Sequence, residues 1–306
     1  MPLIYSIIAP LIIISSVAVY QGEAFTAIET ARLLQNCMLI AGIGTLLQLY
    51  PIWKIGSGLP VVMGISFTFL AACLATASQD YGIMVGAIIV GGCFEGVLGL
   101  TAKYWRKIIS PIVSACVVVS IGLSILNVGV SSFGSSSAYP LGSWQNLLVA
   151  TITLAAALSG GVFGCSPITS FSQNVGLISM THVVNRSTIM FGAPAMILGG
   201  LFPPIGAFFT TLPDCVLGGC TVIMFGSIMM SGVRMMHDAG MDQRNTLIAA
   251  TSICLGVGVT QADGFFNELP SFIGDIFAGN MVAGVFVVGL ILDLCLPRDP
   301  SHYTSM

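Results

Sequence analysis

Charged side chains are scarce in this sequence: only 7% of its 306 residues are Asp, Glu, Lys or Arg. A soluble domain carries about 25% charged residues, so a chain this poor in charge cannot cover a surface that faces water. Hydrophobic residues make up 56% of the chain, and its mean hydropathy is +0.98. The small net charge of −3 gives no basic footprint for nucleic acid. The composition therefore predicts a polytopic integral membrane protein that has the lipid bilayer as its environment and no nucleic-acid partner.

Paired metal-ligand and redox motifs are also lacking. None of the nine cysteines forms a CxxC pair, and most of them lie in apolar runs, where cysteine behaves as a small hydrophobic residue. The sequence indicates no disulfide, zinc site or cofactor, and it contains no nucleophile–base pair. We therefore predict that the protein is not an enzyme and has neither catalytic nor metal-binding residues.

Apolar runs of roughly 15–24 residues recur along the chain, close to the ~20 residues that a helix needs to cross a bilayer. They predict an all-α polytopic fold. We expect membrane spans at residues 3–20, 33–50, 58–77, 83–102, 108–130, 144–163, 170–184, 187–205, 213–233, 245–260 and 277–296.

Lysine and arginine in the short loops give the orientation, because cytoplasmic loops carry an excess of these residues. In the first half, Lys54 and the cluster Lys103–Lys107 fall on the same side. In the second half, Arg186 and the loop Arg234–Arg244 fall on one side. Both termini are then cytoplasmic, which eleven spans do not allow. We infer that the chain lacks an internal piece, and the suspect region is 144–171.

Two proline-led stretches interrupt the apolar pattern. Residues 56–69 contain Pro60, a short β-branched piece, and then glycine and hydroxyl residues at the start of an apolar helix. Residues 166–181 repeat this order and carry Gln173 and Asn174 in the first turn of the helix. Inverted-repeat transporters build substrate sites from two broken helices of opposite direction, and the two extended pieces can pair as strands at mid-membrane. The alternatives are two ordinary kinks, with the polar pair as a helix cap or an interhelical hydrogen bond.

The segment Gln173–Thr181 resembles the signature of the nucleobase–ascorbate transporter family, the xanthine, uric acid and uracil permeases. That signature is Gln or Glu, Asn, any residue, Gly, four further residues and Thr. Gly58–Phe67 resembles the family's third helix, and Pro213–Gly219 with Phe225–Gly226 resembles its twelfth. These segments stand in the family's order, so the resemblance covers most of the chain.

The resemblance implies fourteen spans in two inverted sets of seven, divided into a core and a gate domain, with two short mid-membrane strands before broken helices. This chain lacks the seventh, eighth and most of the ninth helix and resumes near Gly160, which leaves roughly 10–11 spans. A loss of three crossings also produces the conflict between the charges and the span count. The implied domains are 1–105 (core, first part), 106–160 (gate, first part), 161–206 (core, second part, incomplete), 207–297 (gate, second part) and 298–306 (cytoplasmic tail).

By the same resemblance, substrate lies between the third, eighth and tenth helices. Gln173 contacts the base and Asn174 fixes the local geometry, while the backbone at Phe67 and Ser172 hydrogen-bonds the edge of the ligand. An amide suits a purine dione because it both donates and accepts hydrogen bonds. The expected substrate-binding residues are Gln173, Asn174, Ser172, Phe67, Ser66, Gly176 and Thr181.

Two ionisable groups of the family have no counterpart in this chain: a glutamate on the eighth helix, implicated in proton coupling, and a histidine at the start of the first helix. The remaining intramembrane acids are Glu95 and Asp293, and such carboxylates are functional candidates by default. We expect Glu95 to form a structural pair with Lys103, and Asp293 to reach water near the end of its helix.

The resemblance implies a permease of the plasma or inner membrane. Its substrate is a purine nucleobase such as xanthine or uric acid, because members with Gln at the signature position tend to carry oxidised purines. A coupling ion, H⁺ or Na⁺, is an implied partner, no cofactor is implied, and a homodimer remains open. Two alternatives are a truncated remnant that does not transport and an anion carrier of the same architecture. An anion carrier would need a cationic or dipole-rich site, and Gln173 and Asn174 argue against that.

Overall fold

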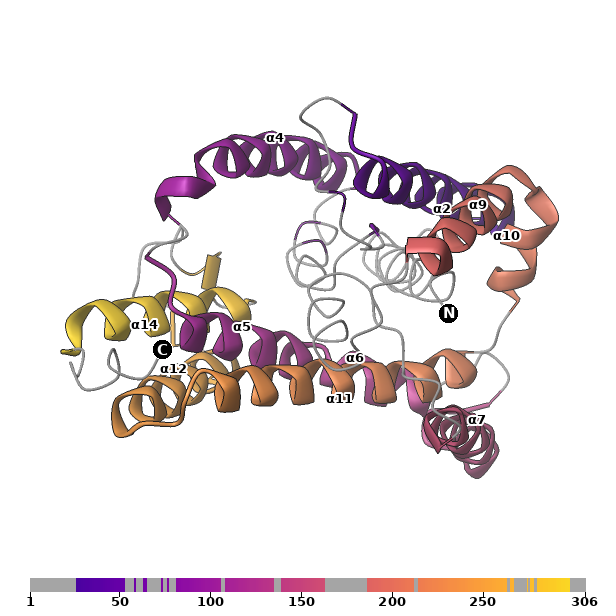
Figure 1. Cartoon of the computed structure of the whole chain (residues 1–306). Coiled ribbons are helices and arrows are strands. Elements are labelled where there is room, and N and C mark those ends of the chain that lie inside the picture. The colour runs from indigo at the N-terminus through magenta and orange to yellow at the C-terminus, as the bar shows by residue number, and fades with distance from the viewer. Residues whose placement is uncertain are drawn as a thin grey trace. The chain divides into compact units, whose positions relative to one another are not determined.

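The structure is a computed structural model in which the described residues form mainly α-helices (Figure 1). The described residues are 26–52, 58, 63–64, 73, 76, 81–105, 108–134, 139–162, 186–211, 214–262, 265–266, 274, 276–277 and 280–297. The helices are α2 (Ala27–Leu49), α4 (Tyr81–Trp105), α5 (Pro111–Ser124), α6 (Leu126–Phe133), α7 (Trp144–Val162), α9 (Arg186–Leu201), α10 (Pro203–Thr210), α11 (Asp214–Asp238), α12 (Gln243–Gln261) and α14 (Met281–Cys295). The predicted all-α class is confirmed.

The predicted spans at 33–50, 83–102, 144–163, 213–233, 245–260 and 277–296 each overlap one helix, whereas those at 108–130 and 187–205 are each divided into two. Three described stretches are long and apolar enough to cross a membrane: Ile28–Leu49, Tyr81–Thr101 and Pro111–Phe133. The spans expected at 3–20 and 170–184 lie outside the described residues, and so does the span at 58–77 except for isolated positions. The strand pairing and the total number of spans therefore stay predictions.

Helix α2 begins at Ala27 rather than near residue 33. A capping box starts the helix: the backbone N–H of Thr26 donates to Glu29 Oε2 at 2.9 Å, and the N–H of Glu29 donates to Thr26 Oγ1 at 3.3 Å. This reciprocal pair satisfies backbone donors that a helix start leaves without partners. Hydropathy alone puts the boundary too late, because the first turns of the helix are polar.

The span expected at 108–130 is divided at Ile125 into α5 and α6. Ile125 has φ −103° and ψ 3°, which lies outside the helical region. Just before this residue, the hydroxyls of Ser120 and Ser124 donate to the carbonyls of Val117 and Ile121 at 2.8 and 2.9 Å. Hydroxyls that bond back to their own helix often bend it, so two in successive turns favour a bend at this point.

The chain divides into two compact units, and the first comprises Met1–Ile88 with Ile125–Ile228. Within it, α2 packs against α9 and α10, and α6 packs against α7. The first part of α11 lies against α6 and α7, where a Cβ at Gly218 would overlap the backbone of Phe133 and one at Gly219 would lie 2.9 Å from the carbonyl oxygen of Ala150. Small residues at helix contacts allow this backbone approach, as is common in membrane bundles.

The second unit comprises Ile89–Ser124 with Met229–Met306. Here α5, α12 and α14 pack on one another around a buried apolar cluster. Gly256 of α12 accommodates Val285 of α14, whose backbone nitrogen would lie 3.0 Å from an added Cβ. The buried cluster consists of Ile112, Val113, Ala115, Cys116, Val119, Met236, Ile248, Ala249 and Val285.

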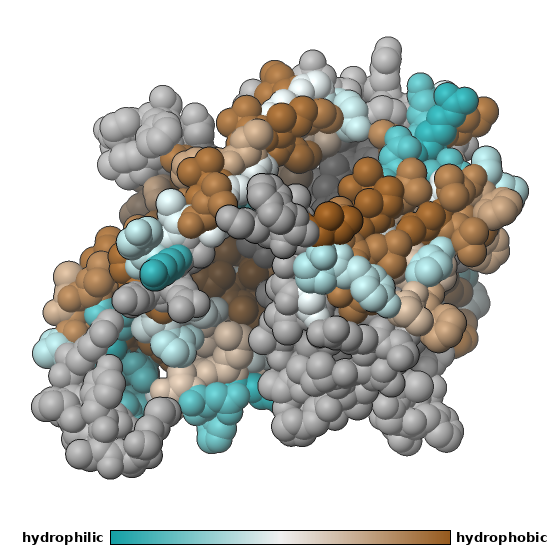
Figure 2. All heavy atoms as spheres, turned by 45° about the horizontal axis from the view of Figure 1, so that its top comes forward, coloured by the Kyte–Doolittle hydropathy of each residue, from teal (hydrophilic) through white to brown (hydrophobic). Residues whose placement is uncertain are grey.

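Helix α4 exposes apolar side chains along almost its whole length. Phe94 and Leu100 are 65% and 87% exposed, and a Cβ at Gly92 or Gly96 would meet no atom within 4 Å. Apolar side chains cover broad areas of the surface that Figure 2 shows. Exposed surface of this kind is what a protein presents to lipid.

Replacing Gly218 with alanine is expected to destabilise the protein by about 1–3 kcal/mol, because the added methyl group forces α11 away from α6. The matched control is Gly226→Ala in the same helix, where a Cβ would meet nothing within 4 Å. Thermal denaturation in detergent, followed by size-exclusion chromatography, measures both variants. Equal midpoints for the two variants would show that the contact at Gly218 is not tight.

Candidate functional site

The predicted substrate-binding residues lie outside the described residues, so their positions stay predictions. They are Gln173, Asn174, Ser172, Phe67, Ser66, Gly176 and Thr181. The structure does describe the helix before the first proline-led stretch, α2, and the helix after the second, α9. It also describes Gly58, Met63 and Gly64 within the first stretch.

Helices α2 and α9 pack side by side (Figure 1), and contacts at the two ends of the pair show that they run antiparallel. The hydroxyl of Tyr50, at the C-terminal end of α2, donates to the sulfur of Met190 near the start of α9 at 2.9 Å. At the other end of the pair, a Cβ on Gly200 would lie 2.8 Å from the carbonyl oxygen of Gln35. The chain therefore leaves α2 for the first proline-led stretch at the same end of the pair at which it enters α9 from the second.

The backbone of the first proline-led stretch is attached to α2 by Thr45. The N–H of Met63 donates to Thr45 Oγ1 at 2.9 Å, and Thr45 Oγ1 donates to the carbonyl of Ala41 at 2.7 Å. The Thr45 side chain is fully buried. Nearer the C-terminal end of α2, the N–H of Gly58 donates to the carbonyl of Gln48 at 3.0 Å. The last turns of α2 therefore hold the stretch at two points.

Gly58 adopts φ +68°. This left-handed conformation strains any residue with a Cβ, so glycine is required where the chain turns into the proline-led stretch. Sequence reasoning used Gly58 as part of a family motif and missed this backbone role.

The expected pair between Glu95 and Lys103 is wrong. Both residues are exposed on α4, and the ion pair that the described part of the chain contains joins two other residues. Eight residues along a helix correspond to about 12 Å, which is too far for a direct contact between these side chains.

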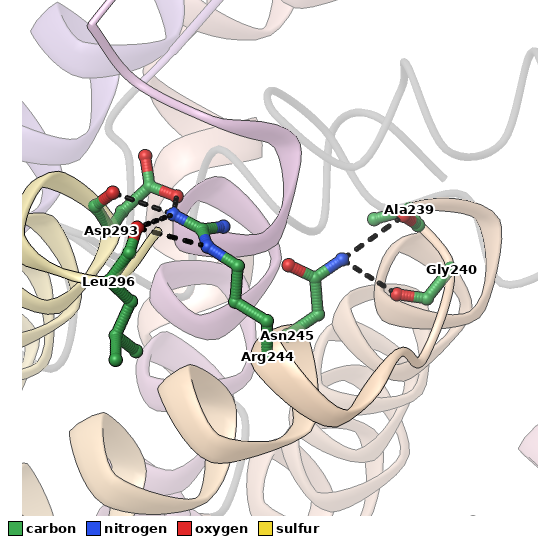
Figure 3. Close-up of polar contacts among 6 residues, drawn as sticks. All are labelled: Ala239, Gly240, Arg244, Asn245, Asp293 and Leu296. Carbon is green, nitrogen blue, oxygen red and sulfur yellow. Dashed lines mark hydrogen bonds and ion pairs between the residues drawn. The ribbon is translucent and has the colours of Figure 1, made fainter. Parts of the chain in front are cut away.

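The expectation that Asp293 reaches water is also wrong. Its carboxylate is fully buried and lies 2.9 Å from the guanidinium of Arg244, whose side chain is 18% exposed (Figure 3). Arg244 Nη2 also donates to the backbone carbonyl of Asp293 at 2.6 Å and to that of Leu296 at 3.3 Å. Arg244 therefore joins the start of α12 to the C-terminal end of α14, where helix carbonyls have no partner in their own helix.

Asn245, beside Arg244, closes the turn between α11 and α12. Its Nδ2 donates to the carbonyl of Gly240 at 2.8 Å and lies 3.4 Å from that of Ala239 (Figure 3). Gly240 has φ +83°, which a glycine adopts without strain. Arg244 thus joins α12 to the end of α14, and Asn245 joins α12 to the turn that follows α11.

Comparison with known proteins decides the family. A family described as the permease family matches this chain in two segments, residues 4–160 and 157–265. The chain belongs to this permease family. It is the nucleobase–ascorbate transporter family that the motifs resemble, and its members are transporters rather than enzymes. Together with the apolar helices, this membership makes the chain an integral, multi-pass membrane protein.

Curated relatives cover almost the whole permease chain. XanQ, a xanthine permease of Escherichia coli (strain K12), is 26% identical over 396 residues, which include 89% of this chain and 85% of XanQ. A xanthine permease of Bacillus subtilis (strain 168) is 27% identical over 395 residues, with 92% and 88% covered. A protein of Clostridium perfringens with the provisional name purine permease is 26% identical over 404 residues, with 96% and 88% covered.

Each of these alignments is longer than the 306 residues of the chain. Many positions of each relative therefore face gaps in this permease. The two segments that match the family meet at residues 157–160, close to Gly160, where the loop charges and motif order predict a missing piece.

Proposed function

We propose that this chain is an internally shortened permease whose substrate is a purine nucleobase such as xanthine or uric acid. The observation that carries the proposal is the match to the permease family on both sides of the junction at 157–160. The second matching segment contains Gln173 and Asn174 at the signature position. Relatives that align over most of the chain are named for xanthine or purine transport.

The chemistry of the signature favours a neutral purine over an anion. The Gln173 amide offers both donors and an acceptor, which the edge of a purine dione requires. An anion carrier would present cations or helix N-termini to its substrate, and the signature supplies no cation. The anion carrier is therefore the weaker alternative.

We propose that the complete form of the permease is a symporter driven by H⁺ or Na⁺. Coupling by a proton requires an ionisable group whose protonation differs between states. In the described part of the chain, Asp293 is held by Arg244, and Glu95 lies exposed on α4. Neither replaces the carboxylate that the resemblance assigns to the missing eighth helix, and this favours the second candidate, a remnant that does not transport by itself.

We propose cytoplasmic termini, because Lys54 follows α2 and Arg186 begins α9 at the same end of this helix pair. The packing agrees with the proposed core and gate division for some helices only, because the first compact unit also contains α6, α7 and the first part of α11, which are assigned to the gate. The helices α2 and α9, both assigned to the core, contact each other. The helices α5, α12 and α14, all assigned to the gate, also contact one another.

Replacing Gln173 with glutamate is expected to change which bases compete with xanthine. The test uses a block-restored chain, in which the stretch of the Bacillus subtilis relative that faces the gap is inserted at residues 157–160. A carboxylate accepts hydrogen bonds but donates none at neutral pH, so xanthine should lose about tenfold in competing strength relative to uracil. The measurement is inhibition of radiolabelled xanthine uptake by a panel of unlabelled bases.

The matched control is Gln243→Glu, the same chemical change at an exposed position at the start of α12. The parent is the block-restored chain without a substitution. A competition profile of Gln173→Glu that equals those of the control and this parent would rule out contact between Gln173 and the base. Absence of xanthine uptake by the parent itself would refute the proposed substrate.

A further inference from the structure

We infer that Thr45 is a positioning residue for the substrate site: its hydroxyl holds the backbone of Met63 against α2. The inference rests on the proposed function, which puts the substrate-binding residues Ser66 and Phe67 three and four positions after Met63. Thr45 lies in none of the motifs that carry the family resemblance, and only the fold brings it to the proline-led stretch.

The geometry shows a hydroxyl that is used in both directions. Thr45 Oγ1 donates to the carbonyl of Ala41 at 2.7 Å and accepts from the N–H of Met63 at 2.9 Å. Because its proton is committed to Ala41, the 3.5 Å contact of Thr45 Oγ1 with the carbonyl of Met63 adds little. The result is a chain of hydrogen bonds, in which each bond polarises and strengthens the next.

A side-chain acceptor is needed at this place because Met63 lies just beyond Pro60, outside a regular helix. An apolar environment offers no water to a backbone N–H that has left a helix, so another protein group must accept from it. The Thr45 side chain is fully buried, so water does not compete for the contact. A threonine normally satisfies its hydroxyl within its own helix, and here the acceptor side of that hydroxyl is turned to a second segment.

Neighbouring contacts define the position of Met63 further. A Cβ built on Gly44 would lie 3.3 Å from Met63 Cβ, so α2 has little room for a larger residue at that point. The N–H of Gly58 donates to the carbonyl of Gln48 at 3.0 Å. The stretch is therefore attached to α2 at two points, Gly58 and Met63, and a change at Thr45 or Gly44 should displace the residues that follow Met63.

Hydrogen exchange of the whole 306-residue chain in lipid nanodiscs tests the contact. Thr45→Val keeps the shape of the side chain but removes the acceptor, so the Met63 amide should exchange about tenfold faster. Thr45→Ser retains the hydroxyl and should restore slow exchange, and Gly44→Ala should also speed exchange at Met63. Peptides from α5, α12 and α14 should exchange as in the parent, which separates a local effect from unfolding.

The matched control is Thr151→Val on α7. Thr151 is exposed, and its hydroxyl donates to the carbonyl of Leu147 at 2.6 Å within its own helix, as that of Thr45 does to Ala41. This variant should leave the Met63 amide unchanged. Equal exchange at Met63 in the Thr45→Val variant and the parent would overturn the inference.

Xanthine binding to the block-restored chain tests the link to the site. Thr45→Val should weaken the Kd for xanthine about tenfold, and Thr45→Ser should recover it. Faster exchange at Met63 with an unchanged Kd would overturn the positioning role. A parent that binds no xanthine would refute the proposed substrate instead, and hydrogen exchange alone would then decide whether Thr45 holds Met63.

Discussion

Replacing Arg244 with alanine is expected to destabilise the permease by about 3–5 kcal/mol, the usual cost of leaving one member of a buried ion pair without its partner. The Asp293 carboxylate is fully buried and would lose its 2.9 Å contact with the guanidinium. The carbonyls of Asp293 and Leu296 would lose a donor at the same time. Unfolding in detergent, measured by the loss of monodisperse protein on heating, gives the size of the effect.

The position of Arg244 supports this expectation. A cation in the first turn of α12 is unfavourable for its own helix, whose N-terminal end carries a partial positive charge. The same cation is favourable at the C-terminal end of α14, which it reaches in the folded protein. Most of the stabilisation by Arg244 therefore comes from its contacts with α14. The Arg244→Ala replacement removes all of these contacts.

Two controls separate this contact from a general effect of charge. Arg234→Ala removes an exposed arginine of α11 and should change stability by less than about 0.5 kcal/mol. The double replacement Arg244→Met with Asp293→Leu removes both buried charges and should recover most of the lost stability. A single Arg244→Ala variant as stable as Arg234→Ala would show that the pair contributes nothing.

The second large effect concerns transport: the 306-residue chain by itself is expected to show no coupled uptake. Alternating access needs a complete core domain that moves against a gate domain around one site. Relatives contain residues that face gaps in this chain, and the resemblance implies that the missing residues include the helix opposite Gln173. Without it, one wall of the proposed site and the carboxylate implicated in proton coupling are both missing.

The energetics of the incomplete site point the same way. Each polar group of a buried site that loses its partner costs of order 1–3 kcal/mol. The amides of Gln173 and Asn174 and the nearby backbone groups would all be affected. A second subunit or a rearranged α7 that closed the site would restore uptake. The first residue to replace would then be Glu95, which lies in the middle part of an apolar helix and, unlike Asp293, forms no ion pair in the described part of the chain.

Helix positions were predictable from sequence because the bilayer imposes a length and an apolar composition on each span. The residues at which helices start or break were harder to predict. The capping box at Thr26 and Glu29 begins α2 with polar residues, which a hydropathy pattern reads as loop. Ser120 and Ser124 look like small residues in an apolar run, and the sequence does not show that their hydroxyls bond to carbonyls just before the break at Ile125.

Tertiary contacts between segments far apart in the sequence were beyond sequence reasoning. Asp293 stands near the end of an apolar run, a position typical of a solvated carboxylate, and nothing local indicates that α12 brings Arg244 to it. Thr45 is a lone hydroxyl in the second half of α2, close to Gly42 and Gly44, and this was the one available sign of a close contact. The family motifs, in contrast, identified the family correctly, because they depend on local sequence alone.

Uptake of radiolabelled xanthine and urate, in cells that lack their own permeases, tests whether the missing piece is needed for transport. The 306-residue chain and the block-restored chain are compared, with surface expression of each checked by a tag. The account predicts no saturable uptake by the 306-residue chain and saturable, ion-dependent uptake by the block-restored chain. Saturable, pH-dependent uptake by the 306-residue chain alone, at equal surface expression, would contradict it.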